Sequence, residues 1–203
     1  YAEDVKDDLE SVVKEEEAEL PYTLFVKPSN MGSSVGISKV RNTEELRAAL
    51  ALAGKYDRRI IIEEGINCRE VETGVIGNHK PEVAAVGEIV AKLDFYDYTA
   101  KYTDDAGTEL SIPAKLPAST YEEIRTLAKK AYMALDCSGF ARIDFFVDKD
   151  TGQVYINEIN TIPGFTKYSM FPLMWKEAGV SFRELVERIV DLGYERYYAK
   201  NNR

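Results

Sequence analysis

Several residue types that build common functional sites are scarce in this chain of 203 residues. Two cysteines, Cys68 and Cys137, are too few for a disulfide framework or a cysteine-based zinc site. The one histidine, His79, stands in a Gly-Asn-His-Lys-Pro turn, so we expect a surface side chain there. No apolar run approaches the roughly 18 residues of a membrane helix, and from the first residues given we expect no secretory leader. We therefore expect a cytoplasmic protein that does not contact a membrane.

The chain also has no excess of basic residues over acidic ones. The formal net charge is -9, and residues 1–20 hold nine acidic side chains against two lysines. Nucleic-acid binding needs clustered positive charge, so we predict no nucleic-acid partner. Within the acidic stretch, apolar residues recur at helical spacing and predict one amphipathic helix with an exposed charged face: Val5, Leu9, Val12 and Val13.

The rest of the pattern predicts an α+β fold with largely antiparallel strands. Strands are expected over residues 24–26, 35–40, 60–64, 69–77 and 83–91, followed by a hairpin over 139–161. Helices are expected over 43–54, 119–135, 170–178 and 181–198. Thr43 precedes two glutamates and is predicted to cap the first of these helices. A tyrosine-rich stretch within about 91–108 has no regular period and is predicted to be a long lid loop.

Aromatic residues near the C-terminus are interpreted as packing residues. Phe165, Tyr168, Phe171 and Trp175 are expected in a core or an interface. Three tyrosines at helical spacing are expected to pack the last helix, with a contact between two copies as the alternative: Tyr194, Tyr197 and Tyr198.

The hairpin carries the strongest chemical signal. Side chains alternate along a strand, so Arg142 and Asp144 share one face. A central turn pairs residues whose numbers sum to about 302, which places Asp144 opposite Glu158 and Arg142 opposite Asn160. Two facing carboxylates and an amide oxygen suit magnesium, especially beside nucleotide phosphates, and Arg142 could hold a phosphate oxygen. The alternative is an ordinary hairpin in which Arg142 bridges to Glu158 on a solvent-exposed face.

A glycine–serine loop over residues 32–36 joins two predicted strands. Its N–H groups and the hydroxyls of Ser33 and Ser34 could bind phosphate, although a purely structural loop is an equal alternative. The loop has neither Walker nor dinucleotide-binding spacing. Lys27 ends the buried strand before this loop, and a charge in that place needs an anionic partner.

Five segments, in order along the chain, share a pattern with one enzyme family. They are FVKPSNMGSSVGISK at 25–39, EEGINCRE at 63–70, YDYTAKY at 96–102, GFARID at 139–144 and NEINTIPGFT at 157–166. Together they resemble the D-alanine–D-alanine ligases, ATP-grasp enzymes that make a peptidoglycan precursor. The resemblance implies an ATP-grasp fold in which ATP lies between two largely antiparallel sheets. Residues 1–63 would be part of the central subdomain, and 64–203 the C-terminal subdomain with the metal site and the lid.

The resemblance also implies the chemistry. The carboxylate of one D-alanine attacks the ATP γ-phosphate to give an acyl phosphate, and the amine of a second D-alanine then displaces phosphate. ATP and two Mg²⁺ ions would be the cofactors, with Mn²⁺ able to substitute. The alternatives are a D-alanine–D-serine ligase, another ATP-grasp carboxylate–amine ligase, or a nucleotide-binding fragment without catalysis.

Roles for individual residues follow from the same resemblance. Nucleotide contacts would come from Lys27, Ser34, Glu63, Glu64, Gly65, Ile66, Glu70, Lys101, Asn157 and Glu158. Backbone groups of residues 63–66 would bind adenine, Glu70 the ribose hydroxyls, and the two lysines the phosphates. The metal ligands would be Asp144, Glu158 and Asn160.

The implied catalytic residues are Ser33, Tyr102, Arg142 and Ser169. Arg142 would stabilise the oxyanion of the tetrahedral intermediate. Ser33 and Tyr102 would organise the substrate pocket and the lid. Ser169, which precedes the predicted helix at 170–178, would bind the carboxylate of the second D-alanine. Tyrosine at position 102 favours an amine nucleophile but does not separate D-alanine from D-serine.

The sequence departs from the family pattern at its start. The family's N-terminal substrate-binding domain cannot be placed in residues 1–21, so we expect this chain to be part of a longer ligase. Alone, it is expected to bind Mg-ATP without making dipeptide. The longer ligase is expected to be a homodimer.

Overall fold

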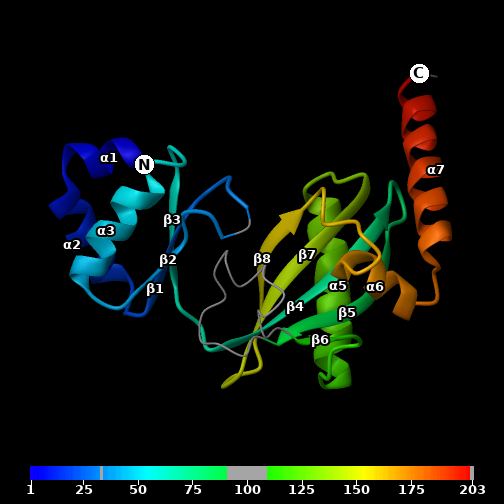
Figure 1. Cartoon of the computed structure of the whole chain (residues 1–203), viewed down its shortest axis with the longest axis horizontal. Helices are drawn as coiled ribbons and strands as arrows, with labels where there is room; N and C mark the ends of the chain where they lie inside the picture. The colour runs from blue at the N-terminus through cyan, green and yellow to red at the C-terminus, as the bar shows by residue number, and fades with distance from the viewer. Residues whose placement is uncertain (33, 91–108, 202–203) are drawn as a thin grey trace. The chain divides into compact units, whose positions relative to one another are not determined.

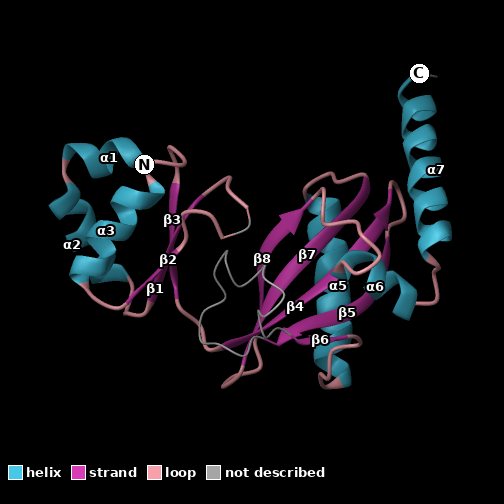
Figure 2. Cartoon of the chain, in the orientation of Figure 1, coloured by secondary structure: helices cyan, strands magenta, loops and turns pink. Residues whose placement is uncertain are grey.

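The computed structural model describes residues 1–32, 34–90 and 109–201. These residues form two compact units, one of residues 1–66 and one of residues 67–90 and 109–201. Each unit contains one sheet, and every strand pairing in the described ranges is antiparallel (Figure 2), which confirms the predicted α+β class. The units separate after Ile66, whereas the predicted boundary followed Glu63. The predicted lid at 91–108 lies outside the described residues.

The first unit packs helices against a three-stranded sheet (Figure 1). Its strands are β1 (Leu24–Pro28), β2 (Ser38–Val40) and β3 (Ile60–Glu64), in the order β2-β1-β3. Its helices are α1 (Ala2–Asp7), α2 (Leu9–Glu19) and α3 (Thr43–Ala53). The apolar core between helices and sheet includes Val13, Leu24 and Leu46.

The acidic N-terminal stretch forms two helices instead of the single helix predicted. The side chain of Asp8 accepts a hydrogen bond from the Ser11 N–H at 3.0 Å, so Asp8 is the N-cap of α2. Helix α1 ends at the residue before it. The predicted apolar stripe is confirmed, because Val13 is buried and its stripe neighbours pack beside it.

Two further predictions in the first unit were wrong. The cap of α3 is Asn42, whose side chain accepts from the Glu45 N–H at 2.9 Å, while the Thr43 hydroxyl donates to Glu17 at 2.5 Å. Strand β2 begins at Ser38, because the residues before it form a turn in which Gly36 has φ +75°. A Cβ at Gly36 would lie 2.7 Å from the ring of Tyr56, so the close packing there requires glycine.

The second unit has a five-stranded sheet in the order β6-β5-β4-β7-β8. The strands are β4 (Cys68–Gly77), β5 (Glu82–Val90), β6 (Glu109–Ser111), β7 (Gly139–Asp148) and β8 (Val154–Asn160). The sequence did not predict β6. Helix α5 (Ala118–Ala134) packs on one face through a core that includes Ile124, Ile143 and Phe145. Helices α6 (Met170–Glu177) and α7 (Phe182–Asn201) pack on strand residues such as Ile76 in a separate core.

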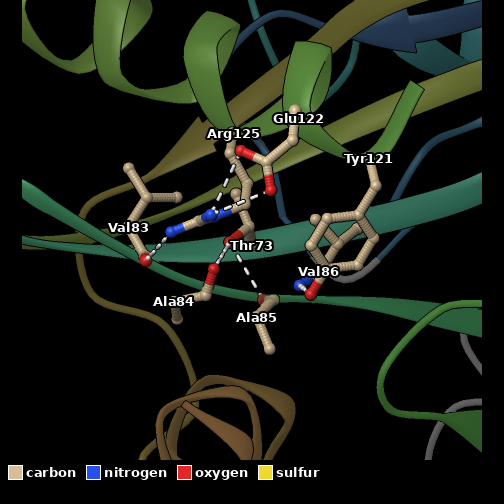
Figure 3. Close-up of polar contacts among 8 residues, drawn as sticks. All are labelled: Thr73, Val83, Ala84, Ala85, Val86, Tyr121, Glu122 and Arg125. Carbon is tan, nitrogen blue, oxygen red and sulfur yellow. Dashed lines mark hydrogen bonds and ion pairs between the residues drawn. The ribbon is translucent and has the colours of Figure 1, made fainter. Parts of the chain in front are cut away.

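Polar contacts hold β5 against its neighbours (Figure 3). The Thr73 hydroxyl on β4 donates to two carbonyl oxygens of β5, that of Ala84 at 3.3 Å and that of Ala85 at 3.0 Å. From α5, Arg125 donates to the Val83 carbonyl at 3.2 Å, and the Tyr121 hydroxyl accepts from the Val86 N–H at 2.8 Å. The Arg125 and Tyr121 contacts satisfy backbone groups of β5 beyond the end of its pairing with β6, and the Thr73 contacts satisfy carbonyls at the register shift between β4 and β5.

Strand β8 contains a β-bulge at Asn157. Asp144 pairs with Glu158, but the next residue of β7, Phe145, pairs with Ile156, so Asn157 is an extra residue. The predicted register is confirmed on the Asn160 side of the bulge and is shifted by one residue on the turn side.

The aromatic predictions near the C-terminus were partly right. Phe171 and Trp175 are buried, whereas Tyr168 is 73% exposed. The tyrosines of α7 do not pack the helix as predicted: Tyr194 and Tyr197 are 61% and 62% exposed. Helix α7 packs instead through other positions, namely Leu185, Ile189 and Leu192.

Candidate active site

Three carboxylates form a row across the sheet of the second unit. Glu72 on β4 is directly opposite Asp144 on β7, which is directly opposite Glu158 on β8. Directly opposed residues face the same side of a sheet, and like charges in such positions repel. The adjacent row across the same strands holds Gly74, Arg142 and Asn160. The carboxylate row therefore needs positive charge, and Arg142 is placed to supply it.

Arg142 binds two of the three carboxylates. Its Nε and Nη2 donate to Asp144 Oδ1 at 2.7 Å and Oδ2 at 2.6 Å, and its Nε lies 3.2 Å from Glu72 Oε2. Burial lowers the pKa of the guanidinium, but the Asp144 hydrogen bonds and the charges of Asp144, Glu72 and Glu158 outweigh it and raise that pKa. The Arg142 side chain is 22% exposed and pairs with Asp144 and Glu72, whereas Glu158 is exposed, so this face of the hairpin is partly buried on β7 and open to solvent on β8.

Glu72 was not singled out from the sequence. Its side chain is 3% exposed, the most buried carboxylate of the row. The available signal was the alternation of Glu70 and Glu72 with Val71 and Thr73, because a glutamate inside a buried strand needs a partner. That partner, Arg142, lies 70 positions further along the sequence.

Helix α6 packs directly against the strand beside the row. A Cβ at Gly74 would lie 2.8 Å from Trp175 Nε1 and 2.9 Å from the ring of Phe171. Glycine therefore lets the helix approach β4 closely, and it leaves no side chain beside Arg142 on that strand.

The donor chemistry of the row fits a divalent cation. Asp144 and Glu158 offer opposed carboxylates and Asn160 an amide oxygen, the hard donors that magnesium prefers. Within the described ranges, no group of three or more His, Cys, Asp or Glu residues is arranged to hold a metal ion. A site here therefore requires the amide of Asn160, and it requires Arg142 to release at least one oxygen of Asp144.

In the first unit, two predicted residues form an ion pair. Lys27 Nζ lies 2.8 Å from Glu63 Oε1, with the lysine side chain 18% exposed. Glu63 thus supplies the anionic partner expected for Lys27. The Gly65 N–H donates to the Thr23 carbonyl at 2.7 Å, so this backbone donor is already engaged. Glu64 is exposed at the end of β3, and Ile66 is the last residue of the unit.

Three other residues predicted to contact the nucleotide lie on different elements. Ser34 lies in a turn with φ 61°, where its carbonyl accepts from the Ile37 N–H at 3.3 Å. Glu70 is opposite Phe146 on β7, and Asn157 is the bulge residue of β8.

Ser169 immediately precedes α6. Its Oγ accepts from the Thr166 N–H at 3.0 Å and lies 2.9 Å from Thr166 Oγ1, and it does not cap the helix. The other predicted residues, Ser33, Lys101 and Tyr102, lie outside the described residues. The structure therefore brings together Arg142, Asp144, Glu158 and Asn160 in the second unit, and Lys27 with Glu63 in the first.

None of the helices in the described ranges is long and apolar enough to cross a membrane.

The family described as "D-ala D-ala ligase C-terminus" matches residues 1–191, which include every predicted site residue. The chain belongs to this ligase family. A D-alanine–D-alanine ligase of Acetivibrio thermocellus is 55% identical over 190 residues, which are 94% of this chain and 50% of that protein. The chain thus spans about half the length of the curated relatives it matches.

Solved structures of ligases share the fold. A D-alanine–D-alanine ligase from Coxiella burnetii superposes with a TM-score of 0.83 at 32% identity, over 97% of this chain and 51% of that chain. The VanG D-Ala:D-Ser ligase from Enterococcus faecalis superposes with a TM-score of 0.82 at 42% identity, over 92% and 54%. The family resemblance noted from the five segments is confirmed.

Proposed function

We propose that a protein of the relatives' length containing this chain is a D-alanine–D-alanine ligase. It would join two D-alanines with ATP and Mg²⁺, through an acyl phosphate, to supply D-alanyl-D-alanine for peptidoglycan precursors. This chain would provide nucleotide- and metal-binding parts. The observation that carries the proposal is the row of three opposed carboxylates, two of them paired with Arg142, in a chain that belongs to this ligase family.

The metal ligands in this proposal are Asp144, Glu158 and Asn160, which would hold two Mg²⁺ ions. When bound, the ions would neutralise phosphate charge and polarise the transferred phosphoryl group. The opposed positions of Asp144 and Glu158 support this assignment, because directly opposed residues lie on the same side of the sheet.

Arg142 would stabilise the oxyanion that forms when the amine attacks. Its pKa is raised above the ordinary value, so the guanidinium keeps its charge throughout the working pH range. A buried, charge-paired donor is pre-oriented, and it need not reorganise when negative charge develops.

Two further roles stay proposals. Lys27, already oriented by Glu63, would donate to a nucleotide phosphate. Ser169 and the N–H groups at the start of α6 would bind a substrate carboxylate, since a helix N-terminus favours an anion.

Metal-dependent nucleotide binding tests the site directly. We expect the 203-residue chain to bind Mg-ATP in calorimetry and the Asp144→Asn/Glu158→Gln variant to lose the magnesium dependence. Glu122→Gln, which removes an exposed carboxylate on α5, is the matched control and should bind as the parent does. Equal binding by the parent and the double variant, with both folded, would rule out this metal site.

The second substrate needs a separate experiment. The VanG structure, at 42% identity, is described as a D-Ala:D-Ser ligase, so D-serine is the competing acceptor. Product analysis of the longer protein with D-alanine alone, and with D-alanine plus D-serine, distinguishes the two. Predominant D-alanyl-D-serine would favour the alternative.

We also propose that the longer ligase is a cytoplasmic homodimer. The exposed apolar side chains of α7, including Val190, Tyr194 and Tyr197, support a contact with a second copy. Sedimentation is expected to show a dimer that Tyr194→Ser with Tyr197→Ser weakens. A monomeric parent protein would contradict this part of the proposal.

A further inference from the structure

The two carboxylates that share Arg142 differ in what else they can bind. Asp144 is opposite Glu158, so it can join a cation site with that residue. Glu72 lies on the other side of Asp144, two strand spacings or roughly 10 Å from Glu158. Within the described residues, no three acidic side chains are arranged to hold one metal ion, so Glu72 is not placed as a third ligand beside Asp144 and Glu158. With 3% of its side chain exposed, Glu72 is also closed to solvent. Arg142 is a close cationic partner of this buried charge.

A cation at Asp144 must compete with Arg142. The guanidinium holds both carboxylate oxygens of Asp144, at 2.7 and 2.6 Å. A divalent ion that takes either oxygen would also repel the guanidinium. Without a second anchor, Arg142 would either keep Asp144 from the cation or leave the row when the cation binds.

Glu72 supplies that second anchor. Its Oε2 is 3.2 Å from Arg142 Nε, the same nitrogen that donates to Asp144 Oδ1. The guanidinium can therefore shift its hydrogen bond from Asp144 to Glu72 without leaving the row. In both arrangements the buried Glu72 charge stays paired, which avoids the large cost of a buried, unpaired carboxylate.

We propose that Glu72 is a positioning residue that retains Arg142 when a divalent cation binds Asp144. The inference rests on the proposed function, in which Asp144 is a metal ligand and Arg142 acts on the substrate. Glu72 thereby couples metal binding to the placement of the catalytic guanidinium.

Glu72→Gln tests the coupling, because it keeps the side-chain shape and removes the charge. With the 203-residue chain and Mn-ATP as the probe, we expect the variant to bind roughly five- to tenfold more weakly than the parent. Glu72→Asp, which restores the carboxylate, should recover part of the loss.

A matched control is available on the next strand. Glu88→Gln also removes a buried carboxylate from a bidentate pair with an arginine, Arg69, but Glu88 is opposite Val71 instead of Glu72. We expect this variant to lose stability and to keep the parent's Mn-ATP affinity.

The second readout is the Nε–H signal of Arg142 in ¹⁵N NMR, assigned by its absence in Arg142→Lys. In the parent, the signal should stay protected from solvent exchange with and without Mg-ATP. In Glu72→Gln it should be protected without Mg-ATP and lost when Mg-ATP is added. A merely structural role for Glu72 predicts no such dependence on the metal.

The outcomes separate the inference from the proposed function. If the folded parent does not bind Mn-ATP, the proposed site fails and the inference fails with it. If the parent binds and Glu72→Gln matches it, or loses no more than Glu88→Gln does, the inference is overturned and the proposed function stands. If Glu72→Gln is unfolded by circular dichroism, Glu72→Asp decides, because its shorter side chain holds the carboxylate farther from Arg142 Nε. Protection of the Nε–H signal that weakens only when Mg-ATP is added supports the inference, and protection that Mg-ATP leaves unchanged, with the parent's Mn-ATP affinity, overturns it.

Discussion

Two arginines of the second unit make the same hydrogen bonds in different surroundings. Arg69 donates to Glu88 from Nε at 2.7 Å and from Nη2 at 2.6 Å, and Arg142 donates to Asp144 at the same two distances. Arg69 completes its contacts with the Lys115 carbonyl, so one charge balances one charge. Arg142 lies beside a row of three carboxylates, whose formal charge with the arginine is -2. Pair geometry alone therefore does not distinguish a structural ion pair from a reactive site, whereas the surplus charge around it does.

The largest expected difference between the two arginines is in ligation. Arg142→Ala in the longer protein should lower kcat by roughly 100- to 1000-fold, because a pre-oriented donor to the oxyanion is lost. Arg69→Ala, measured at a temperature where it is folded, should keep kcat unchanged. Similar losses in steady-state assays of both variants would remove the distinction.

Loss of Arg69 should lower stability without lowering kcat. Arg69→Ala leaves Glu88, with a side chain only 11% exposed, without its ion-pair partner, so we expect a loss of about 2–4 kcal/mol in the free energy of unfolding. Urea denaturation of the 203-residue chain measures it. The exposed pair Arg183–Glu187 is the control, since Arg183→Ala should cost less than about 1 kcal/mol.

Magnesium added without nucleotide should affect the stability of Arg142→Ala and Arg69→Ala differently. In Arg142→Ala the carboxylate row has no arginine to offset its charge, so added Mg²⁺ should bind there and raise the free energy of unfolding by about 1 kcal/mol. Arg69→Ala should gain no more than the parent does. Thermal melts with and without Mg²⁺ test this, and equal gains in both variants would contradict a cation site at the row.

The last expected effect appears only at alkaline pH and concerns Cys68, which precedes Arg69. Burial, and then the charge of Glu70, raise the pKa of its thiol from 9.0 to about 11. Below pH 9 the folded and unfolded chains both hold the proton. Between about pH 9 and 11 only the unfolded chain loses it, so stability should fall with pH in that range. Cys68→Ser should flatten this slope in urea melts, and an unchanged slope would show that the thiol is solvated.

The hairpin shows how much of the site can be predicted from the sequence. Alternation and a single turn suffice to place Asp144 opposite Glu158, because both residues belong to neighbouring strands joined by a short loop. Glu72 could not be placed in the same way, since its pairing with β7 depends on strand order, which local patterns do not specify. The sequence predicts local pairs well and the third member of a row poorly.

Errors elsewhere in the prediction have equally local causes. Asn42 and Thr43 are both good caps, and the structure selects Asn42 because Thr43 has a competing partner in Glu17. Asp8 interrupts the N-terminal helix by capping the next one, although the apolar stripe continues across the break. Propensity and periodicity identify the elements, but competing side-chain contacts decide where they begin and end.

The bulge at Asn157 divides β8 into two segments whose side-chain alternation differs by one residue. Val154 and Glu158 are an even number of residues apart and would share one face of a regular strand. The extra residue instead places Val154 opposite Val147, against the core beneath α5, and leaves Glu158 in the carboxylate row. One inserted amino acid therefore lets selection tune the turn half of the strand for packing and the other half for chemistry. Substitutions in one half need no compensating change of pattern in the other.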